Sequence, residues 1–233
     1  MDNRCYINGK RKSAMLNQAV VKKSQQISVI ESRFSSQPES VDMSFVVEES
    51  AGFKLWIITN CSINLEVVMA GQNATADVRI IGIGQNGDVL SIKTRQIHQS
   101  PLTTSNLEYR SVLSDQSASE FDGLIEITAN GQQSVAYQKN SNLLLSPGAK
   151  AASKPFLQIL TNDVKCTHGA TTGPLNQDQI NYLLCRGLTL DQARRELILG
   201  GLYSAAEMFA NNRSRNRVSK IINQVSQTQF SDA

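Results

Sequence analysis

The residues with the clearest chemical potential are a cysteine and a histidine two positions apart, in the stretch Val164-Lys-Cys-Thr-His-Gly-Ala. If this stretch is extended, Cys166 and His168 project from the same face of the strand. A thiolate and an imidazole suit zinc, iron or a nascent iron–sulfur cluster. Two ligands cannot close a tetrahedral site, so a metal here needs ligands from elsewhere in the chain or from another chain. The alternative is a surface thiol beside a histidine that hydrogen-bonds a neighbouring loop.

The motifs of common enzyme classes are missing from the sequence. The chain contains two histidines, His98 and His168, and no GxxxxGK[ST], GxSxG or HExxH motif. Gly82, Gly84 and Gly87 match the dinucleotide-binding pattern GxGxxG by letter. They lie in a β-rich run with no helical pattern after it, which indicates a strand that ends in a turn.

Composition places the chain among soluble folded domains. Its 233 residues are 40% hydrophobic and 18% charged, which allows one sizeable core. The net charge of +3 is too small to indicate binding to nucleic acid or to a membrane surface. No apolar run approaches the ~18–20 residues that a membrane-spanning helix needs. The N-terminus lacks the apolar segment of a secretory signal, so we expect a cytoplasmic protein.

The remaining cysteines are expected to have structural roles. They are widely spaced and form no CxxC pair, which favours free thiols in a protein that is not secreted. Cys61 falls in a predicted strand and Cys185 in a predicted helix, and both are expected to be buried. Cys5 lies in residues 1–40, which are polar and rich in Ser, Gln and Lys. We predict that these 40 residues form a flexible leader.

From residue 41 to about 170 the sequence consists of short β segments separated by turn signals. In Phe53-Lys-Leu-Trp-Ile, for example, alternate residues are apolar and share one face. The candidate strands are Met43–Glu48, Phe53–Thr59, Ile63–Met69, Ala76–Ile83, Val89–Ile97, Leu107–Leu113, Glu120–Thr128, Ser134–Tyr137, Asn142–Leu145 and Phe156–Leu160. Both a β-sandwich and a solenoid fit this spacing. No strict repeat period is visible, and the spacing taken alone favours the sandwich slightly.

After Gly173 the apolar pattern becomes helical. Gly187 stands where a first helix would stop, and Gly200-Gly201 is expected to interrupt a second. Two pairs of residues three positions apart have the types found at helix starts, namely Asn176 with Gln179 and Thr189 with Gln192.

A last amphipathic stretch has apolar residues at i, i+3, i+4 and i+7, which are Val218, Ile221, Ile222 and Val225. Such short helices cannot form an independent core. They either pack on the β domain or offer an apolar stripe to another protein.

Residues 98 to 202, read as a block, resemble the C-terminal half of SufB/SufD proteins. Several ordered motifs over roughly 105 residues carry this resemblance. The motifs are His98-Gln-Ser-Pro-Leu-Thr-Thr-Ser-Asn, Val112-Leu-Ser-Asp-Gln-Ser-Ala-Ser-Glu-Phe-Asp-Gly, Tyr137-Gln-Lys-Asn-Ser-Asn-Leu-Leu-Leu-Ser, Ser153-Lys-Pro-Phe-Leu-Gln-Ile, Asp163-Val-Lys-Cys-Thr-His-Gly-Ala-Thr-Thr-Gly and Gln179-Ile-Asn-Tyr-Leu-Leu-Cys-Arg-Gly-Leu.

The resemblance implies a mainly β fold, a right-handed parallel β-helix followed by a small C-terminal α-helical domain. It implies a non-catalytic scaffold for iron–sulfur cluster assembly rather than an enzyme. In the family, SufB and SufD pair through their β-helix cores, and each C-terminal helical domain docks one SufC ATPase. For this chain we accordingly expect a SufC-type ATPase and either a SufB-like subunit or a second copy as partners. A transient iron–sulfur cluster is expected, with no tightly bound cofactor.

Three features of the resemblance favour SufD over SufB. His168, in its CxHGA motif, matches a SufD histidine implicated in cluster formation at the subunit interface, and Cys166 matches the neighbouring cysteine. SufB-type chains carry an essential cysteine before the strand that contains the proline aligned with Pro155, and residues 146–154 here contain none. The acidic residue that follows the histidine in SufB is Gly169 here.

The expected organisation is a leader at 1–40, a β-helix core at 41–173, a helical domain at 174–226 and a tail at 227–233. Family members usually carry an N-terminal helical domain, so this sequence is expected to be a short form. The residues assigned to ATPase docking are Tyr182, Leu183, Arg186, Gly187, Leu197 and Ile198.

Two other functions remain as alternatives. One is a structural or interaction protein of the same fold that has lost cluster chemistry. The other is a β-helical enzyme that acts on carbohydrate, suggested by analogy of fold alone. Such an enzyme needs a carboxylate pair in a cleft, and the acidic residues Asp115, Glu120, Asp122 and Glu126 show no pattern that demands one.

Overall fold

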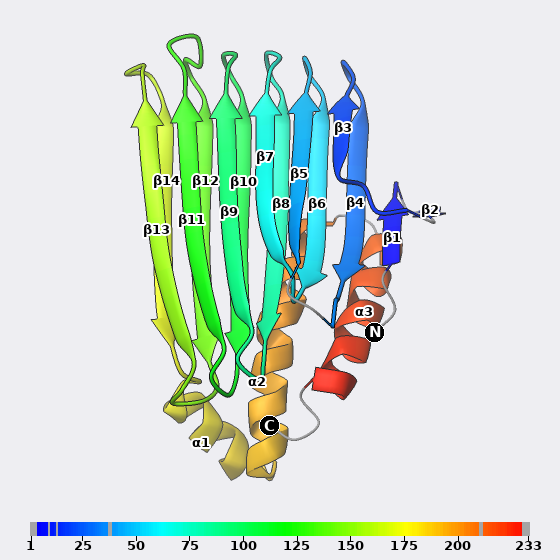
Figure 1. Cartoon of the computed structure of the whole chain (residues 1–233), viewed down its shortest axis with the longest axis vertical. Helices are drawn as coiled ribbons and strands as arrows, with labels where there is room; N and C mark the ends of the chain where they lie inside the picture. Colours follow the sequence, from blue (N-terminus) through cyan, green and yellow to red (C-terminus); the bar gives the residue numbers. More distant parts are fainter. Residues whose placement is uncertain (1–3, 9, 13, 37–38, 210–211, 230–233) are drawn as a thin grey trace.

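The computed structural model shows a two-sheet parallel β-solenoid of about five turns followed by three helices (Figure 1). It describes residues 4–8, 10–12, 14–36, 39–209 and 212–229. The expectation of a parallel β-helix followed by helices is therefore confirmed. The strands are β1 Arg4–Ile7, β2 Lys10–Lys12, β3 Gln18–Val21, β4 Gln26–Arg33, β5 Ser40–Val47, β6 Gly52–Thr59, β7 Ser62–Met69, β8 Thr75–Gly84, β9 Val89–His98, β10 Thr104–Leu113, β11 Ala118–Ile127, β12 Val135–Leu144, β13 Lys150–Ile159 and β14 Lys165–Gly173.

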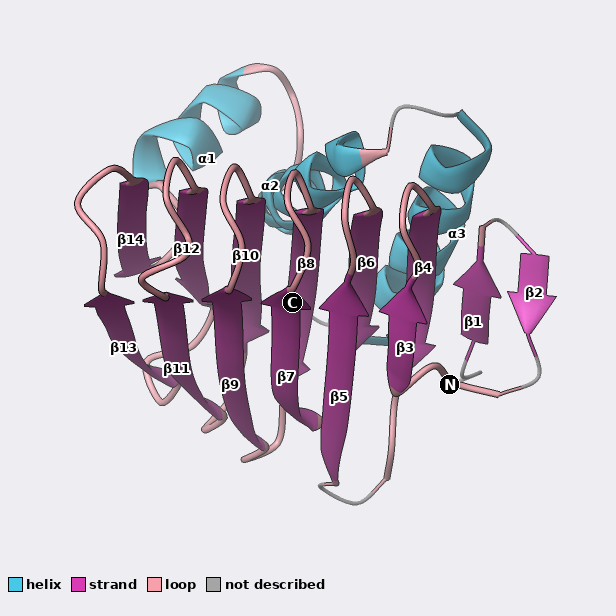
Figure 2. Cartoon of the chain, turned by 90° about the horizontal axis from the view of Figure 1, so that it is seen from above, coloured by secondary structure: helices cyan, strands magenta, loops and turns pink. Residues whose placement is uncertain are grey.

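Successive strands alternate between two sheets. Sheet A has the order β14-β12-β10-β8-β6-β4-β1-β2, and sheet B has the order β13-β11-β9-β7-β5-β3. From β3 onward every strand pairs in parallel with the strand one coil away. Figure 2 shows the two sheets facing each other, with the helices on the outer side of sheet A and none over the outer side of sheet B.

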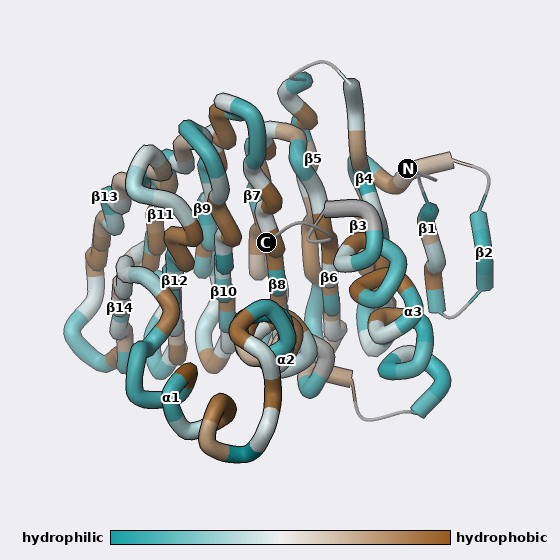
Figure 3. The backbone as a smooth tube through the Cα atoms, turned by 90° about the horizontal axis from the view of Figure 1, so that it is seen from below, coloured by the Kyte–Doolittle hydropathy of each residue, from teal (hydrophilic) through white to brown (hydrophobic). Residues whose placement is uncertain are grey.

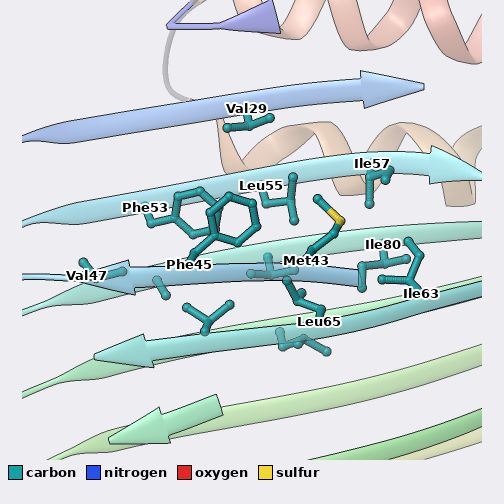
Figure 4. Close-up of a cluster of buried hydrophobic side chains, with 14 of the residues drawn as sticks. Val29, Met43, Phe45, Val47, Phe53, Leu55, Ile57, Ile63, Leu65 and Ile80 are labelled. Atoms are coloured by element: carbon teal, nitrogen blue, oxygen red, sulfur yellow. The ribbon is translucent and has the colours of Figure 1, made fainter. Parts of the chain in front are cut away.

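The interior is formed by alternate residues of both sheets. In β5, β7 and β11 the inward positions are buried and the outward positions are half-buried or exposed, and Figure 3 shows the matching alternation of hydropathy along the strands. The rings of Phe45 and Phe53 stack across the interior with centroids 4.3 Å apart, among the aliphatic side chains of Figure 4. Each such side chain contributes roughly 1.5–3 kcal/mol on burial, and this burial holds the two sheets together.

The turns between coils also stack on one another. Asn73, Leu102 and Gln133 each have φ near +58°, and each donates its backbone N–H to a carbonyl in the turn of the next coil. The predicted turn at the end of the GxGxxG segment is confirmed, because β8 ends at Gly84 and Gly87 has φ of +88°.

The prediction of a flexible leader at 1–40 is wrong for most of that segment, since β1 to β4 lie within it. The ladder turns antiparallel here, with β1 pairing with β4 and β2 with β1. The carboxylate of Glu31 is fully buried and accepts hydrogen bonds from Sγ of Cys5, the N–H of Leu16 and Nε of Arg33. These contacts hold Cys5 and Leu16 against the interior of the first coil. Residues 1–3, 9, 13, 37 and 38 of the expected leader lie outside the described residues.

Two strand predictions needed revision in the last coils. Ser134–Tyr137 and Asn142–Leu145 were predicted as separate strands, but β12 runs unbroken from Val135 to Leu144. Its inward positions after Ala136 are Gln138, Asn140 and Asn142, whose polar side chains hid the alternation. The segment around Cys166 is extended and forms β14, which is the condition under which Cys166 and His168 share one face.

The three helices are α1 Gln177–Cys185, α2 Leu190–Ser204 and α3 Asn212–Gln229, with the short 3-10 helix η1 at Ala205–Met208. Both predicted caps are present, because Asn176 accepts from the N–H of Gln179 and Thr189 forms a capping box with Gln192. The predicted interruption at Gly200-Gly201 is absent, since α2 continues through both glycines.

Helix α3 packs on the β domain. Val218, Ile221, Ile222 and Val225 are buried in a cluster with Ile30 and Trp56 of sheet A, so the apolar stripe of this helix is used within the chain. The expected tail begins inside α3, which extends to Gln229; residues 230–233 lie outside the described residues. No described helix has the length and hydropathy needed to cross a bilayer.

Candidate functional site

The two ends of the solenoid differ. At the first coil Cys5 and Leu16 of the N-terminal segment pack against the interior, and Val21 and Val29 are fully buried. At the other end of the solenoid β13 and β14 are the last strands of their sheets. Positions that are buried in the coil before are half-buried or exposed in this last coil. Ile125 and Ile127 of β11 are fully buried, whereas their register partners Leu157 and Ile159 are 41% and 37% exposed. The end of the solenoid is therefore an uncovered cross-section of the core, which we call the end face: the inward residues of β13 and β14 together with Leu160.

Cys166 lies on the end face, in the inward row of sheet A. Its register partner is Ala136, and it packs against the small apolar cluster of Ile125, Ile127 and Ala136. This half-buried setting raises the pKa of the Cys166 thiol. Lys165 lies on the opposite face of the strand, so it does not assist deprotonation.

His168 lies two residues further along the same inward row. Its register partner is Gln138 of β12, and its side chain is exposed. The structure thus places Cys166 and His168 on one face, at the rim of the open end, as the sequence predicted for an extended segment. Among the described residues no group of three or more His, Cys, Asp and Glu side chains is placed to hold a metal ion. The pair therefore supplies part of a ligand set.

A polar network lies inside the solenoid behind this rim. Nδ1 of His98 lies 2.7 Å from Oγ1 of Thr103, and its Nε2 lies 2.8 Å from Oγ of Ser105. Gln96 donates to the same Ser105 oxygen at 2.7 Å, and Thr103 bonds Ser134 at 2.7 Å. Burial lowers the pKa of His98 to about 4, so the ring is neutral at physiological pH. His98 therefore has a structural role in the interior.

Sequence reasoning missed the buried amides of β12. Gln138 and Asn140 are each 1% exposed and point inward in the coil directly below β14. The alternation from Ala136 to Asn142 could have revealed them if amides had been allowed at interior positions. These side chains make the interior polar where it approaches the end face.

The other cysteines are distributed differently from the prediction. Cys61 is buried as expected, but it lies in the bend between β6 and β7 and not in a strand as predicted. Cys5 is buried too, because the segment that carries it forms β1. Cys185 is exposed at the end of α1, so its prediction as a buried thiol is wrong. In the described part of the chain neither Cys5 nor Cys61 can serve an accessible site.

Most residues assigned to ATPase docking lie on or next to α1. Tyr182 is 57% exposed, and the guanidinium of Arg186 lies 5.1 Å from the centroid of its ring. Gly187 is exposed and Leu183 is half-buried. Ile198 is 2% exposed and belongs to the cluster under α2, so its assignment as a docking contact is corrected to a core residue. Leu197 is half-buried beside the cavity described next.

The helices are fixed to sheet A by polar contacts as well as by apolar packing. Arg110 of β10 donates to the carbonyl of Gly201 and, at 2.9 Å, to Oγ of Ser204 in α2. Lys54 of β6 donates to the carbonyl of Met208 at 2.9 Å. Nearer the end face a cavity of about 420 Å³ separates the helices from β12 and β14. The helical layer is thus anchored over β6 and β10, and the cavity is lined on β14 by Thr171, Thr172 and Gly173.

Comparison with known proteins agrees with these features. Residues 41–201 match the family described as SUF system FeS cluster assembly, SufBD core domain. The chain is 30% identical over 135 residues to the iron–sulfur cluster assembly protein SufD of Escherichia coli, which covers 58% of this chain and 32% of that protein. It is 32% identical over 173 residues to the chloroplastic protein ABCI7 of Arabidopsis thaliana, covering 74% and 35% of the two chains. It spans about a third of the length of these two relatives.

The fold, the CxHGA strand and these matches agree with one another. The family profile covers most of the solenoid and continues into α2. The chain belongs to the SufBD family of iron–sulfur cluster assembly proteins and is SufD-like.

Proposed function

We propose that this chain is a non-catalytic scaffold subunit that pairs through its end face and docks a SufC-type ATPase through α1. Its partner across the end face is a SufB-like subunit or a second copy of the chain, in the cytoplasm. Cys166 and His168 contribute ligands to a transient iron–sulfur cluster, which is the cargo of the assembly rather than a resident cofactor.

The observation that carries this proposal is the uncovered cross-section of the core at the last coil. Leu157, Ile159 and Leu160 are apolar and exposed side by side with the free edges of β13 and β14. A free parallel edge pairs readily with another chain, and natural proteins normally blunt or cover it. At the first coil the interior is covered by the N-terminal segment of the same chain. We infer that a second chain covers the interior at the last coil in the same way.

Pairing there would complete the ligand set. Cys166 and His168 face the end that a partner would cover, and cluster iron needs more ligands than these two residues. The raised pKa of Cys166 keeps the thiol protonated at neutral pH until iron or a partner cation stabilises the thiolate.

Helix α1 supports the docking part of the proposal. Tyr182, Leu184 and Leu190 are exposed apolar side chains at and just after this helix. Stacking of Arg186 on Tyr182 adds a cationic group to the same surface. Tyrosine and arginine side chains that become buried when a partner binds are common anchors in protein interfaces.

The cluster role is tested by maturation of iron–sulfur enzymes in a strain that depends on this chain. His168→Ala is expected to lower their activity about tenfold or more, because loss of one ligand weakens an already partial site. Thr167→Ala is the matched control, since Thr167 is the adjacent exposed residue on the opposite face. Unchanged maturation in His168→Ala would remove the histidine from the cluster role.

Anaerobic reconstitution with iron and sulfide separates this function from the alternative of a scaffold without cluster chemistry. Absorbance of a cluster that depends on Cys166 and His168 supports the assembly role. A paired complex that forms no cluster would favour the interaction protein.

Docking is tested by capture of the ATPase on the full chain. Tyr182→Glu is expected to weaken capture strongly, because it places a charge at the centre of the apolar surface. Lys220→Glu, at an exposed position of α3, is the control for added negative charge. Equal capture by both variants would move the docking site away from α1.

A further inference from the structure

The side chain directly beneath His168 is the buried amide of Gln138. In the parallel register of β12 and β14, Gln138 is the partner of His168, and both occupy the inward row. Adjacent strands lie about 4.8 Å apart, so side chains on the same face at paired positions are in contact range.

The side chain of Gln138 has an unpaired hydrogen-bond acceptor. The residue is 1% exposed, and its Oε1 has no hydrogen-bond partner among the described residues. A buried carbonyl left unpaired costs on the order of 1–3 kcal/mol, so such an atom in a native interior calls for an explanation. No hydrogen bond joins this oxygen to His168 in the structure, although His168 is the register partner above it. A ring N–H of this exposed histidine, turned toward Oε1, would satisfy it.

The interior is shaped to hold this amide. Gly123 of β11 lies across from Gln138, and a Cβ at Gly123 would stand 2.0 Å from Nε2 of Gln138. The absence of a side chain at Gly123 therefore leaves the space that the Gln138 amide fills. The amide group is held in place by the fold rather than free in solvent.

We propose that Gln138 is a positioning residue for His168: its side-chain carbonyl accepts one ring N–H of His168, which fixes the tautomer and turns the other ring nitrogen toward the end face. Ligand histidines commonly donate their second N–H in this way, and the bond selects the ring orientation. The inference deepens the proposed function, since it assigns the support of one of its two ligands.

Asn140 provides a matched control on the same strand. It is equally buried, points inward, and has both side-chain polar atoms unpartnered among the described residues. Its register partner in β14 is Ala170, which has no group to position. Any effect on His168 that arises from general loosening of the polar interior should appear in both variants.

The test is the tautomer of His168 in the full-length protein, read from ring ¹⁵N shifts at pH 8 after selective labelling of histidine. The chain has two histidines, so the spectrum contains His98 and His168 alone. Gln138→Leu is expected to shift the tautomer ratio of His168 at least about twofold toward that of free imidazole. Asn140→Leu should leave the ratio as in the wild type. An unchanged ratio in folded Gln138→Leu overturns the proposal.

A second measurement needs no variant. In the wild type, nuclear Overhauser contacts are expected between the side-chain amide protons of Gln138 and the ring protons of His168, and their absence overturns the proposal. These readouts use the protein without a cluster. If Gln138→Leu leaves the tautomer ratio of His168 unchanged while cluster assembly still needs His168, the positioning role alone is rejected. If the variant shifts the ratio but the wild type assembles no cluster, the proposed function is rejected.

Discussion

Leu157 lies directly opposite Ile125 in the parallel register of β13 and β11, yet Leu157 is 41% exposed and Ile125 is fully buried. The two side chains occupy equivalent interior positions one coil apart. The difference is that Ile125 has a further coil above it and Leu157 has none. The exposed apolar side chains at this end are the reason for the proposed pairing with another chain.

Association through the end face is expected to depend on Leu157. Leu157→Glu should weaken pairing with a second copy or a SufB-like subunit by about tenfold or more, because an unpaired charge would be buried in the interface. Sedimentation equilibrium measures the effect. Val20→Glu serves as the control, since Val20 is similarly exposed on β3 at the other end of the solenoid. Equal association of wild type and Leu157→Glu would place the interface elsewhere.

Acid sensitivity is expected from His98. Its pKa is lowered from 6.5 to about 4 by burial, so between these values the unfolded chain binds a proton that the folded chain does not. The contribution of neutral His98 to the free energy of unfolding is therefore fully present above pH 6.5. It is lost as the pH falls toward 4, by about 1.4 kcal/mol per pH unit and about 3 kcal/mol in total. Urea unfolding at several pH values measures this slope. In His98→Gln the free energy of unfolding should fall less steeply with decreasing pH over this range, by about 1.4 kcal/mol per pH unit. An unchanged pH dependence would assign the acid sensitivity to other groups.

The contributions of Glu31 and Arg33, the ion pair in the first coil, to the free energy of unfolding should depend strongly on each other. Nε of Arg33 lies 2.7 Å from the fully buried carboxylate of Glu31. Arg33→Met is expected to lower the free energy of unfolding by about 3–5 kcal/mol, because it leaves a buried charge unpaired. The double variant Glu31→Leu/Arg33→Met should cost less than the sum of the single changes. Additive effects in this double-mutant cycle would show that the two side chains act independently.

Close backbone approach makes Gly71 sensitive to any side chain. A Cβ there would stand 2.0 Å from the backbone nitrogen of Glu49, which cannot move aside without displacing the strand connection. Gly71→Ala should therefore destabilise the protein by about 1–3 kcal/mol in denaturant unfolding. At Gly169 a Cβ would meet nothing within 4 Å, so Gly169→Ala should change stability by less than about 0.5 kcal/mol. A similar result for both would contradict the close packing at Gly71.

Local features were readable from the residues alone. Alternation placed most of the strands, residue types three positions apart marked the starts of α1 and α2, and the CxH spacing put Cys166 and His168 on one face. Each of these depends on backbone geometry within a few residues, which the sequence specifies directly. The family resemblance then selected the solenoid over the sandwich.

The repeat itself was hidden because the coils differ in length. Register partners are Gln26 with Gly52, Gly52 with Thr75, Thr75 with Thr104, Thr104 with Val135 and Val135 with Lys165. The separation along the chain thus changes from coil to coil, so no fixed period exists to find, although the pairing within each strand is continuous.

Burial was decided by the tertiary structure. The same kind of side chain is core at Ile125 and surface at Leu157, and polar Gln138 is buried while apolar Leu160 is exposed. Whether a residue is covered depends on the coil stacked against it, some thirty positions away, and on whether such a coil exists. The sequence by itself determined the faces of the strands and the identity of the two candidate ligands. Only the stacking of the coils decided that these ligands lie at an open end, above a buried amide.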